Sequence, residues 1–287
     1  MGMEKLKLKR GNFRIAALML CLTMFLVSAL RAEEPERPPE PKPEDKLQTT
    51  FGVDVFSQYV FRGVAFSRNS AVFQPSVTFA YKGLVANVWN NFDSSEKNPL
   101  GLKNPNNRQA RWNETDLTFS YSREVLKNLT LTGGLIYYIL DSNTSAFNSF
   151  EVYAGFGYKL PWFEFGFAAY REVGHFPGTY LQLYLSRSVD LPFWGASLDL
   201  WASWGAELSE DKAAFPIPDK PNKFYQSLHA GHLMATLNFP LGKYVKFSPK
   251  IMYWYALGGD STKVIEGLSW DGGHNHLLGG ATLSVTF

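Results

Sequence analysis

A two-residue alternation of apolar and polar side chains constrains the fold most, and it is strictest in the last twelve residues, 276–287. Leu277, Leu283, Val285 and Phe287 share one face of this stretch, and the intervening positions are mostly polar. A two-residue period predicts a β-strand with one apolar side. An open strand edge is a liability, and pairing with the first strand of a closed barrel would remove it. On this stretch alone, a soluble β-sandwich and a barrel remain equal alternatives.

The first 32 residues have the three parts of a secretory signal peptide. Basic side chains occur within 1–14, an apolar run of 16 residues fills 15–30, and small residues occur at 27–29 and at Ala32. The run is short for a helix that crosses a membrane. We therefore expect an exported protein whose signal peptide, 1–32, is cleaved after Ala29 or after Ala32.

Removal of residues 1–32 changes the composition that bears on function. Cys21 is the only cysteine and follows Leu20 rather than a small residue, so we expect neither lipidation nor any disulfide or thiolate site. The segment holds six of the 28 basic and one of the 26 acidic residues, which leaves a formal net charge of −3. Nucleic acid is therefore not an expected partner.

Residues 33–48 are charged and rich in proline, and we expect a short periplasmic tail without a core.

Alternating segments continue from residue 49 and predict an all-β fold, a 12-stranded antiparallel transmembrane β-barrel over residues 49–287. Most segments are near the roughly 10 residues that a tilted spanning strand needs. Their connections are alternately short and long, which is typical of periplasmic turns and extracellular loops. Aromatic residues gather beside the short turns, as in an interfacial girdle. The expected strands are 50–62, 71–82, 84–93, 112–122, 128–140, 148–158, 163–171, 179–187, 194–205, 225–239, 245–256 and 276–287.

Two stretches resemble known barrel proteins. The strand that ends at Phe287 is similar to the final strand of bacterial outer-membrane barrels, which the barrel-assembly machinery reads. A second stretch, within residues 49–93, resembles the TorF-type family of bacterial outer-membrane β-barrel proteins. These resemblances imply a bacterial outer-membrane location and leave the solute open. The second is carried by Ser57-Gln58-Tyr59-Val60-Phe61-Arg62-Gly63, Phe73-Gln74-Pro75-Ser76 and Tyr81-Lys82-Gly83-Leu84.

The polar faces of the expected strands would line the barrel interior. A charge held there needs water or an opposite partner, so the pattern fits either a charged pore or a salt-bridged network that fills the lumen. Acidic positions outnumber basic ones, which predicts a mild preference for cations in an open pore, although a shift of one residue in register would reverse the faces. The expected pore-lining residues are Asp54, Gln58, Arg62, Asn87, Asn91, Glu114, Asp116, Glu151, Glu164, Asp199 and Lys250.

Two weaker motifs point to other chemistry. His274, His276 and Asp271 could hold a metal ion through imidazole nitrogens, but a solvated loop end is the better interpretation. Ser227 and His229 share a strand face, as do a Ser and a His in outer-membrane phospholipase A. Here their order is reversed and no residue is placed by the sequence to orient the imidazole. We expect no catalytic residue, no metal site and no cofactor.

The leading functional hypothesis is a porin-like channel for passive diffusion of small polar solutes or ions. The alternatives are a barrel with a closed lumen that has a structural or surface-interaction role and, less favoured, an outer-membrane lipid hydrolase. Loops 94–111, 206–224 and 257–275 could fold inward and set selectivity, or they could contact neighbouring molecules or extracellular ligands. The expected partners are outer-membrane lipid, the barrel-assembly machinery and small polar solutes or ions.

Overall fold

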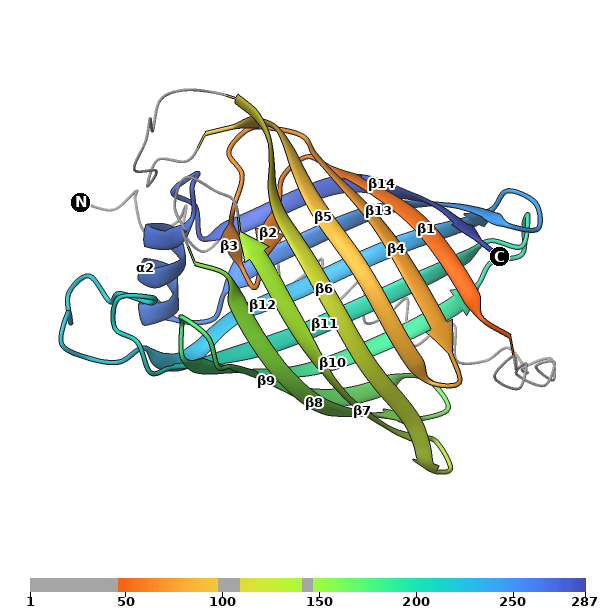
Figure 1. The fold of residues 1–287 in the computed structure, drawn as a ribbon, viewed down its shortest axis with the longest axis horizontal. Coiled ribbons are helices and arrows are strands. Elements are labelled where there is room, and N and C mark those ends of the chain that lie inside the picture. Colours follow the sequence, from red (N-terminus) through yellow and green to blue (C-terminus); the bar gives the residue numbers. More distant parts are fainter. Residues whose placement is uncertain (1–45, 98–108, 141–146) are drawn as a thin grey trace, which may run out of the picture. The chain divides into compact units, whose positions relative to one another are not determined.

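A computed structural model describes residues 46–97, 109–140 and 147–287. The expected signal peptide, 1–32, and the expected tail, except for residues 46–48, lie outside this part. Twelve strands form one closed antiparallel barrel, which confirms the predicted fold class (Figure 1). The strands of the barrel are β1 (Gln48–Phe56), β4 (Val72–Tyr81), β5 (Leu84–Glu96), β6 (Gln109–Leu126), β7 (Leu129–Leu140), β8 (Ser149–Lys159), β9 (Glu164–Glu172), β10 (Gly178–Asp190), β11 (Ser197–Ser209), β12 (Gln226–Pro240), β13 (Val245–Ala256) and β14 (Asn275–Thr286).

The barrel closes where its first strand meets its last. β1 pairs with β14 from Thr50 opposite Thr286 to Phe56 opposite Gly280. The backbone N–H of Thr49 donates to the carbonyl oxygen of Phe287 at 3.1 Å, and the N–H of Phe287 donates back at 2.9 Å. β1 also pairs with β4, so both of its edges are occupied. A closed ring of strands satisfies the backbone groups that lipid cannot hydrogen-bond.

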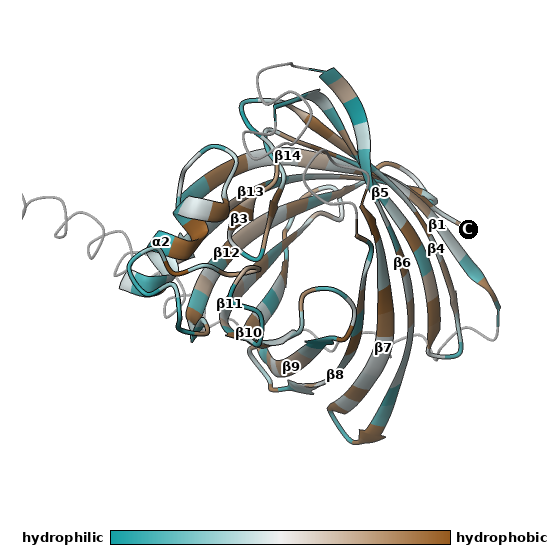
Figure 2. Ribbon diagram, turned by 60° about the vertical axis from the view of Figure 1, so that its left-hand side comes forward, coloured by the Kyte–Doolittle hydropathy of each residue, from teal (hydrophilic) through white to brown (hydrophobic). Residues whose placement is uncertain are grey.

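The wall of the barrel is apolar outside and polar inside. Large apolar side chains such as Phe119, Leu131 and Leu183 are 50%, 46% and 48% exposed. The polar neighbours Ser120 and Gln182 take the opposite face, and Figure 2 shows the alternation of hydrophobic and hydrophilic positions along the strands. This distribution is that of a β-barrel whose outer face lies in lipid. No helix in the described ranges combines the length and apolar character needed to cross a membrane.

One end of the barrel is made of tight turns. Lys82 and Gly83 join β4 to β5 with positive φ angles of 48° and 85°, as in the hairpin turn whose twist matches its strands. A Cβ on Gly83 would lie 2.3 Å from the carbonyl oxygen of Ser122. Glycine is therefore required there. The other end carries longer connections, including helix α2 (Gly259–Leu268) between β13 and β14 (Figure 1).

The expected first strand, 50–62, is too long, because β1 ends at Phe56. The chain then forms an inward segment, Ser57–Ala71, in which β2 (Val60–Phe61) pairs with β3 (Val64–Ala65). Arg62 and Gly63 turn this small hairpin with φ angles of 49° and 88°. Tyr59, Val60 and Phe61 are residue types common in strands, so composition does not separate this stretch from β1.

The inward segment is held inside the barrel by apolar packing. Val64 is 4% exposed and lies in one buried cluster with Trp254 of β13 and Leu278 of β14. Ile265 of α2 completes the contact from the loop end, and it is fully buried. The segment and the helix therefore pack against each other as well as against the wall. Buried apolar contact of this kind stabilises the fold by about 25 cal/mol per Å² removed from water.

The lipid-facing position of Leu183 allows a test of the membrane orientation. We expect Leu183→Arg to lower the free energy of unfolding in lipid vesicles by about 2–4 kcal/mol, because a charge near the middle of the bilayer must be desolvated. Leu160 in the turn between β8 and β9 is the control, since a charge near the interface costs about 0–1 kcal/mol. Equal costs at both positions, measured by urea titration, would contradict the orientation.

Candidate functional site

The barrel interior is the candidate functional site, because it gathers the polar side chains of all the wall strands. Gln58 and Arg62 reach the interior from the inward segment and not from a wall strand, which corrects the expected position of both residues. The other expected residues lie on strands, on the face opposite the exposed apolar side chains. These are Asp54 of β1, Asn87 and Asn91 of β5, Glu114 and Asp116 of β6, Glu151 of β8, Glu164 of β9, Asp199 of β11 and Lys250 of β13.

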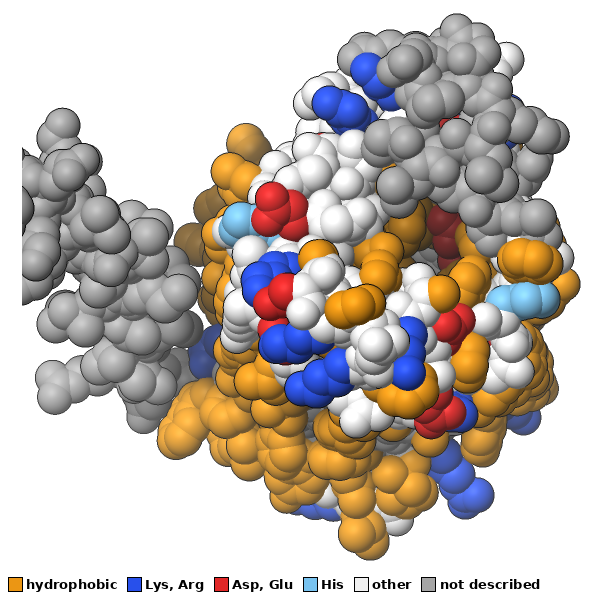
Figure 3. Space-filling model, turned by 90° about the vertical axis from the view of Figure 1, so that its left-hand side faces the viewer, with side chains coloured by type: hydrophobic (Ala, Val, Ile, Leu, Met, Phe, Trp, Pro, Cys, Tyr) orange, Lys and Arg blue, Asp and Glu red, His pale blue; other side chains and the backbone are white. Residues whose placement is uncertain are grey.

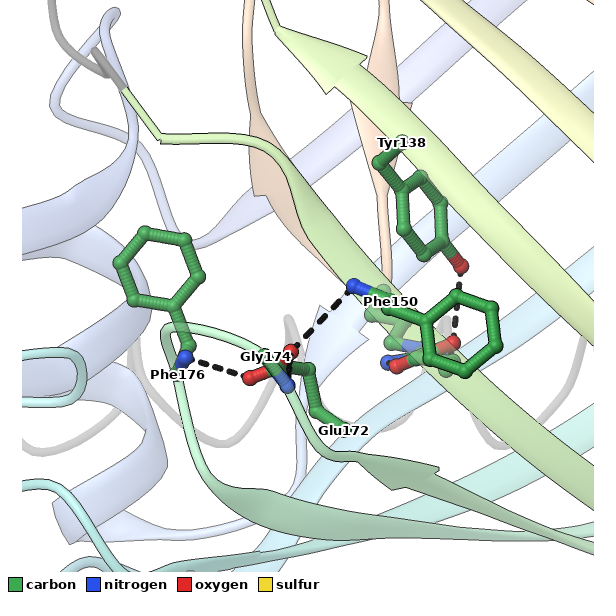
Figure 4. Close-up of polar contacts among 7 residues, drawn as sticks. Tyr138, Phe150, Glu172, Gly174 and Phe176 are labelled. Carbon is green, nitrogen blue, oxygen red and sulfur yellow. Dashed lines mark hydrogen bonds and ion pairs between the residues drawn. The ribbon is translucent and has the colours of Figure 1, made fainter.

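Arg62 lies at the tip of the hairpin formed by β2 and β3 and forms an ion pair with the barrel wall. Its Nη1 and Nη2 donate to the two carboxylate oxygens of Glu151 at 2.7 and 2.9 Å. The guanidinium carbon lies 5.0 Å from the ring centre of Tyr170 and 4.4 Å from that of Tyr180. The Tyr138 hydroxyl donates to the same carboxylate at 2.8 Å (Figure 4). Arg62 therefore combines a bidentate ion pair with cation–π contacts, both of which are strong interactions for a guanidinium group.

Gln58 fastens the other side of the inward segment to the connection between α2 and β14. Its amide donates to Asp271 Oδ2 at 2.6 Å, and His276 Nδ1 lies 3.2 Å from the same oxygen. Nearby, the Ala65 N–H donates to Ser269 Oγ at 3.1 Å. Hydrogen bonds therefore join the segment to the loop in addition to the apolar contacts.

The acidic pair Glu114 and Asp116 lies opposite the hairpin on β6. The two carboxyls interact with each other and with Tyr59 of the inward segment. The ring of Tyr59 lies 5.6 Å from that of Trp89. Asp116 Oδ1 is buried without a hydrogen-bond partner among the described residues. Buried charge of one sign favours the uptake of an opposite charge or a proton.

Other interior carboxylates are matched within the wall. Lys250 Nζ lies 2.9 Å from Asp54 Oδ1, and the Thr282 hydroxyl donates to the same oxygen. The Tyr184 hydroxyl donates to Glu164 at 2.9 Å. Asp199 accepts hydrogen bonds from Ser188 and Asn238 at 2.6 Å each. Of these three carboxylates, only that of Asp54 is paired with a cation, so the lining described here keeps an excess of negative charge.

Glu172 shows that an interior carboxylate can also be structural. It accepts hydrogen bonds from the backbone N–H groups of Phe150 at 3.4 Å, Gly174 at 2.6 Å and Phe176 (Figure 4). These donors belong to β8 and to the connection between β9 and β10. The side chain therefore closes that connection onto the neighbouring strand, and we do not assign it to the pore lining.

The residues considered for catalysis and metal binding have other partners. His229 is 1% exposed, and its Nδ1 lies 2.9 Å from the Tyr225 hydroxyl; no hydrogen bond joins it to Ser227 in the described structure. His274 lies 3.6 Å from Glu266, whereas His276 contacts Asp271. No group of three or more potential metal ligands gathers within the described ranges.

Several side chains around Arg62 were missed by the sequence analysis. Tyr138, Tyr170 and Tyr180 sit on inward faces of β7, β9 and β10, and Glu207 of β11 interacts electrostatically with Arg62. The two-residue period predicts that each faces inward. It does not reveal that the hairpin tip brings one cation to all of them.

The Asp271 contacts predict a pH dependence. Burial alone raises the pKa of this carboxyl, but hydrogen bonds from His276, Gln58 and the Gly273 N–H outweigh it and lower the pKa to about 2. The unfolded value is about 3.9, so the stabilisation is present at neutral pH and is lost as the pH falls from about 4 towards 2. We expect the unfolding free energy of the natural chain to fall more steeply over this range than that of Asp271→Asn. Parallel curves in denaturant titrations would contradict the assignment.

Comparison with solved structures finds similar barrels. An outer membrane channel of the COG4313 type from Pseudomonas putida F1 has a TM-score of 0.53 at 10% identity, covering 88% of this chain and 100% of its own. The NanC porin has a TM-score of 0.47 at 9% identity, covering 84% of this chain and 99% of its own. The first of these likenesses shows a common fold and, at 10% identity, nothing finer. No curated protein matches the sequence.

The family comparison gives a firmer relation. The family described as bacterial protein of unknown function (Gcw_chp) matches residues 40–213, which is more than half of the chain and includes the Arg62 hairpin. The TorF name suggested by residues 57–63 is not the name of this family and stays a prediction. The chain belongs to the Gcw_chp family of bacterial proteins.

Proposed function

We propose that the protein is a porin-like channel through which small polar solutes or ions diffuse, with a preference for cations. The observation that carries the proposal is the excess of carboxyl groups over basic groups on the inward face, which includes Glu164 and Asp199 without a cationic partner among the described residues. A low-dielectric wall lined by one sign of charge concentrates ions of the opposite sign. The fold shared with the COG4313 outer membrane channel supports the same class of function.

The inward segment would set the narrowest part of this route. It brings Tyr59 to the acidic pair on β6 and Arg62 to Glu151 on β8, two strands away along the same side of the wall. In Figure 3, which views the loop end, the surface is hollowed beside apolar side chains, and an acidic side chain lies inside the hollow. A solute entering there meets carboxylates before it meets the tight-turn end.

A second candidate is a barrel with a closed lumen. It is favoured by the same segment, because Val64, Trp254, Ile265 and Leu278 fill part of the interior with a buried apolar cluster. Such a barrel would act through its loops or as a structural element of the membrane. The lipid hydrolase is the weakest alternative, and it requires that Ser227→Ala abolish lipid turnover.

Conductance across a planar bilayer tests the channel. We expect discrete current steps from the refolded barrel and, in asymmetric KCl, a reversal potential of the sign that indicates cation preference. The double variant Glu164→Gln with Asp199→Asn should shift the reversal potential towards zero, because it removes two inward carboxylates that help to concentrate cations.

The control for this measurement is Asp219→Asn, which neutralises an exposed carboxylate that pairs with Lys263 at 2.7 Å in the loops. We expect its reversal potential to equal that of the natural chain. An anion preference would refute the proposed selectivity. Silence from a barrel shown to be folded would favour the closed lumen.

A further inference from the structure

The partners of Arg62 form a complete receptor without the hairpin. Tyr138, Glu151, Tyr170 and Tyr180 come from four consecutive wall strands, β7 to β10. Glu151 is 3% exposed, Tyr180 3% and Tyr138 8%. Because they belong to the hydrogen-bonded wall, they keep their places whether or not the hairpin tip is present. We call these four residues the wall receptor.

The wall receptor has the chemistry of a guanidinium site. Glu151 offers two oxygens at 2.7 and 2.9 Å to two nitrogens of one planar group. The rings of Tyr170 and Tyr180 lie within 5.0 Å of the guanidinium carbon. Planar guanidinium groups match both the carboxylate fork and the aromatic faces, whereas an ammonium group is a compact point charge that matches the fork less well.

A second acidic side chain lies beside the wall receptor. Glu207 of β11 is 4% exposed and interacts electrostatically with both Arg62 and Glu151. Whenever the carboxyl of Glu207 is ionised, it adds to the attraction of this position for a cation.

The occupant is tethered by a small element. β2 and β3 contain two residues each, and Arg62 lies in the two-residue turn between them. A short two-stranded hairpin has marginal stability by itself. The ion pair between Arg62 at its tip and Glu151 of the wall therefore helps to hold it in position. A tethered group competes with free solutes at an effective concentration that is about millimolar for short flexible links.

We propose that the wall receptor binds guanidinium groups of diffusing solutes, and that Arg62 is its built-in occupant. A solute bearing a guanidinium group competes with Arg62 and releases the hairpin tip from Glu151. The inference rests on the proposed channel, since the lumen is the route by which a solute reaches the receptor. It narrows the substrate class from cations in general to guanidinium compounds.

Calorimetric titration of the folded protein in detergent with methylguanidinium tests the receptor. Arg62→Ala empties the site and should bind the probe, whereas the natural chain should bind at least about tenfold more weakly because Arg62 competes. Adding Glu151→Gln to Arg62→Ala should weaken binding at least about tenfold, since the fork is lost. Methylammonium should bind Arg62→Ala more weakly than methylguanidinium.

The matched control is Arg62→Ala combined with Glu210→Gln. Glu210 forms a similar forked pair with Arg171, at 2.6 and 2.7 Å, outside the barrel interior. This double variant should bind methylguanidinium as Arg62→Ala does. The proposal would be overturned if Glu210→Gln weakened methylguanidinium binding as much as Glu151→Gln does. It would also be overturned if folded Arg62→Ala did not bind methylguanidinium.

A second measurement keeps Arg62 in place and covers the case in which Arg62→Ala does not fold. Val64→Cys puts a thiol in the buried cluster beside the hairpin turn, and Leu160→Cys puts one in an exposed turn. Methylguanidinium should accelerate maleimide labelling of the first thiol and leave the second unchanged. No acceleration at saturating probe refutes displacement.

These results are separable from those of the channel test. A potassium current without guanidinium binding leaves the channel standing and overturns the receptor. Binding to Arg62→Ala by a barrel that carries no current supports the receptor and refutes the channel.

Discussion

A backbone group without a hydrogen-bond partner costs several kcal/mol in lipid, and the pairing of β1 with β14 removes the last open edges of this sheet. The other features follow from that closure. A closed wall has only an outside and an inside, so each strand must alternate between lipid and lumen. Phe119 and Ser120 take opposite faces for this reason, and the interior is where charge collects.

A charged side chain inside the barrel needs a partner of opposite charge or a hydrogen-bonding group. The chain supplies such partners in different ways. Asp54 is paired with Lys250 of the wall itself. Glu151 is paired with a cation that arrives on a loop, through Arg62. Glu114 and Asp116 share Tyr59 but have no basic partner among the described residues. The inward segment is thus an electrostatic part of the lumen as well as an apolar filling, and this dual character underlies both functional candidates.

The fold could be predicted because the strand period is local. Residues such as Asp116 and Glu151 were placed on the inward face by counting alternate positions along one strand. Gln58 and Arg62 were assigned to a strand that ends at Phe56, because Tyr59, Val60 and Phe61 are residue types common in strands. The positive φ angles at Arg62 and Gly63 reveal the turn. Contacts between the hairpin tip and β7 to β10 depend on three-dimensional packing that no local pattern encodes.

Helix α2 was missed for a related reason. It is a single short helix whose buried side chains, Val264 and Ile265, find their partners in distant parts of the chain. A segment of 10 residues is too short to be stable alone, so packing decides its form.

The reciprocal hydrogen bonds between Thr49 and Phe287 have a consequence for the order of the chain. They bring the two ends of the barrel to the same rim, beside the tight turns. In a closed barrel every strand is hydrogen-bonded to two neighbours, so the stability of the ring does not depend on which strand comes first in the sequence. A short linker from residue 287 to residue 48, with a new opening at Lys82–Gly83, would leave every strand pair intact. The barrel is therefore suited to circular permutation, and the inward hairpin would move to the end of the permuted sequence while keeping its place against the wall.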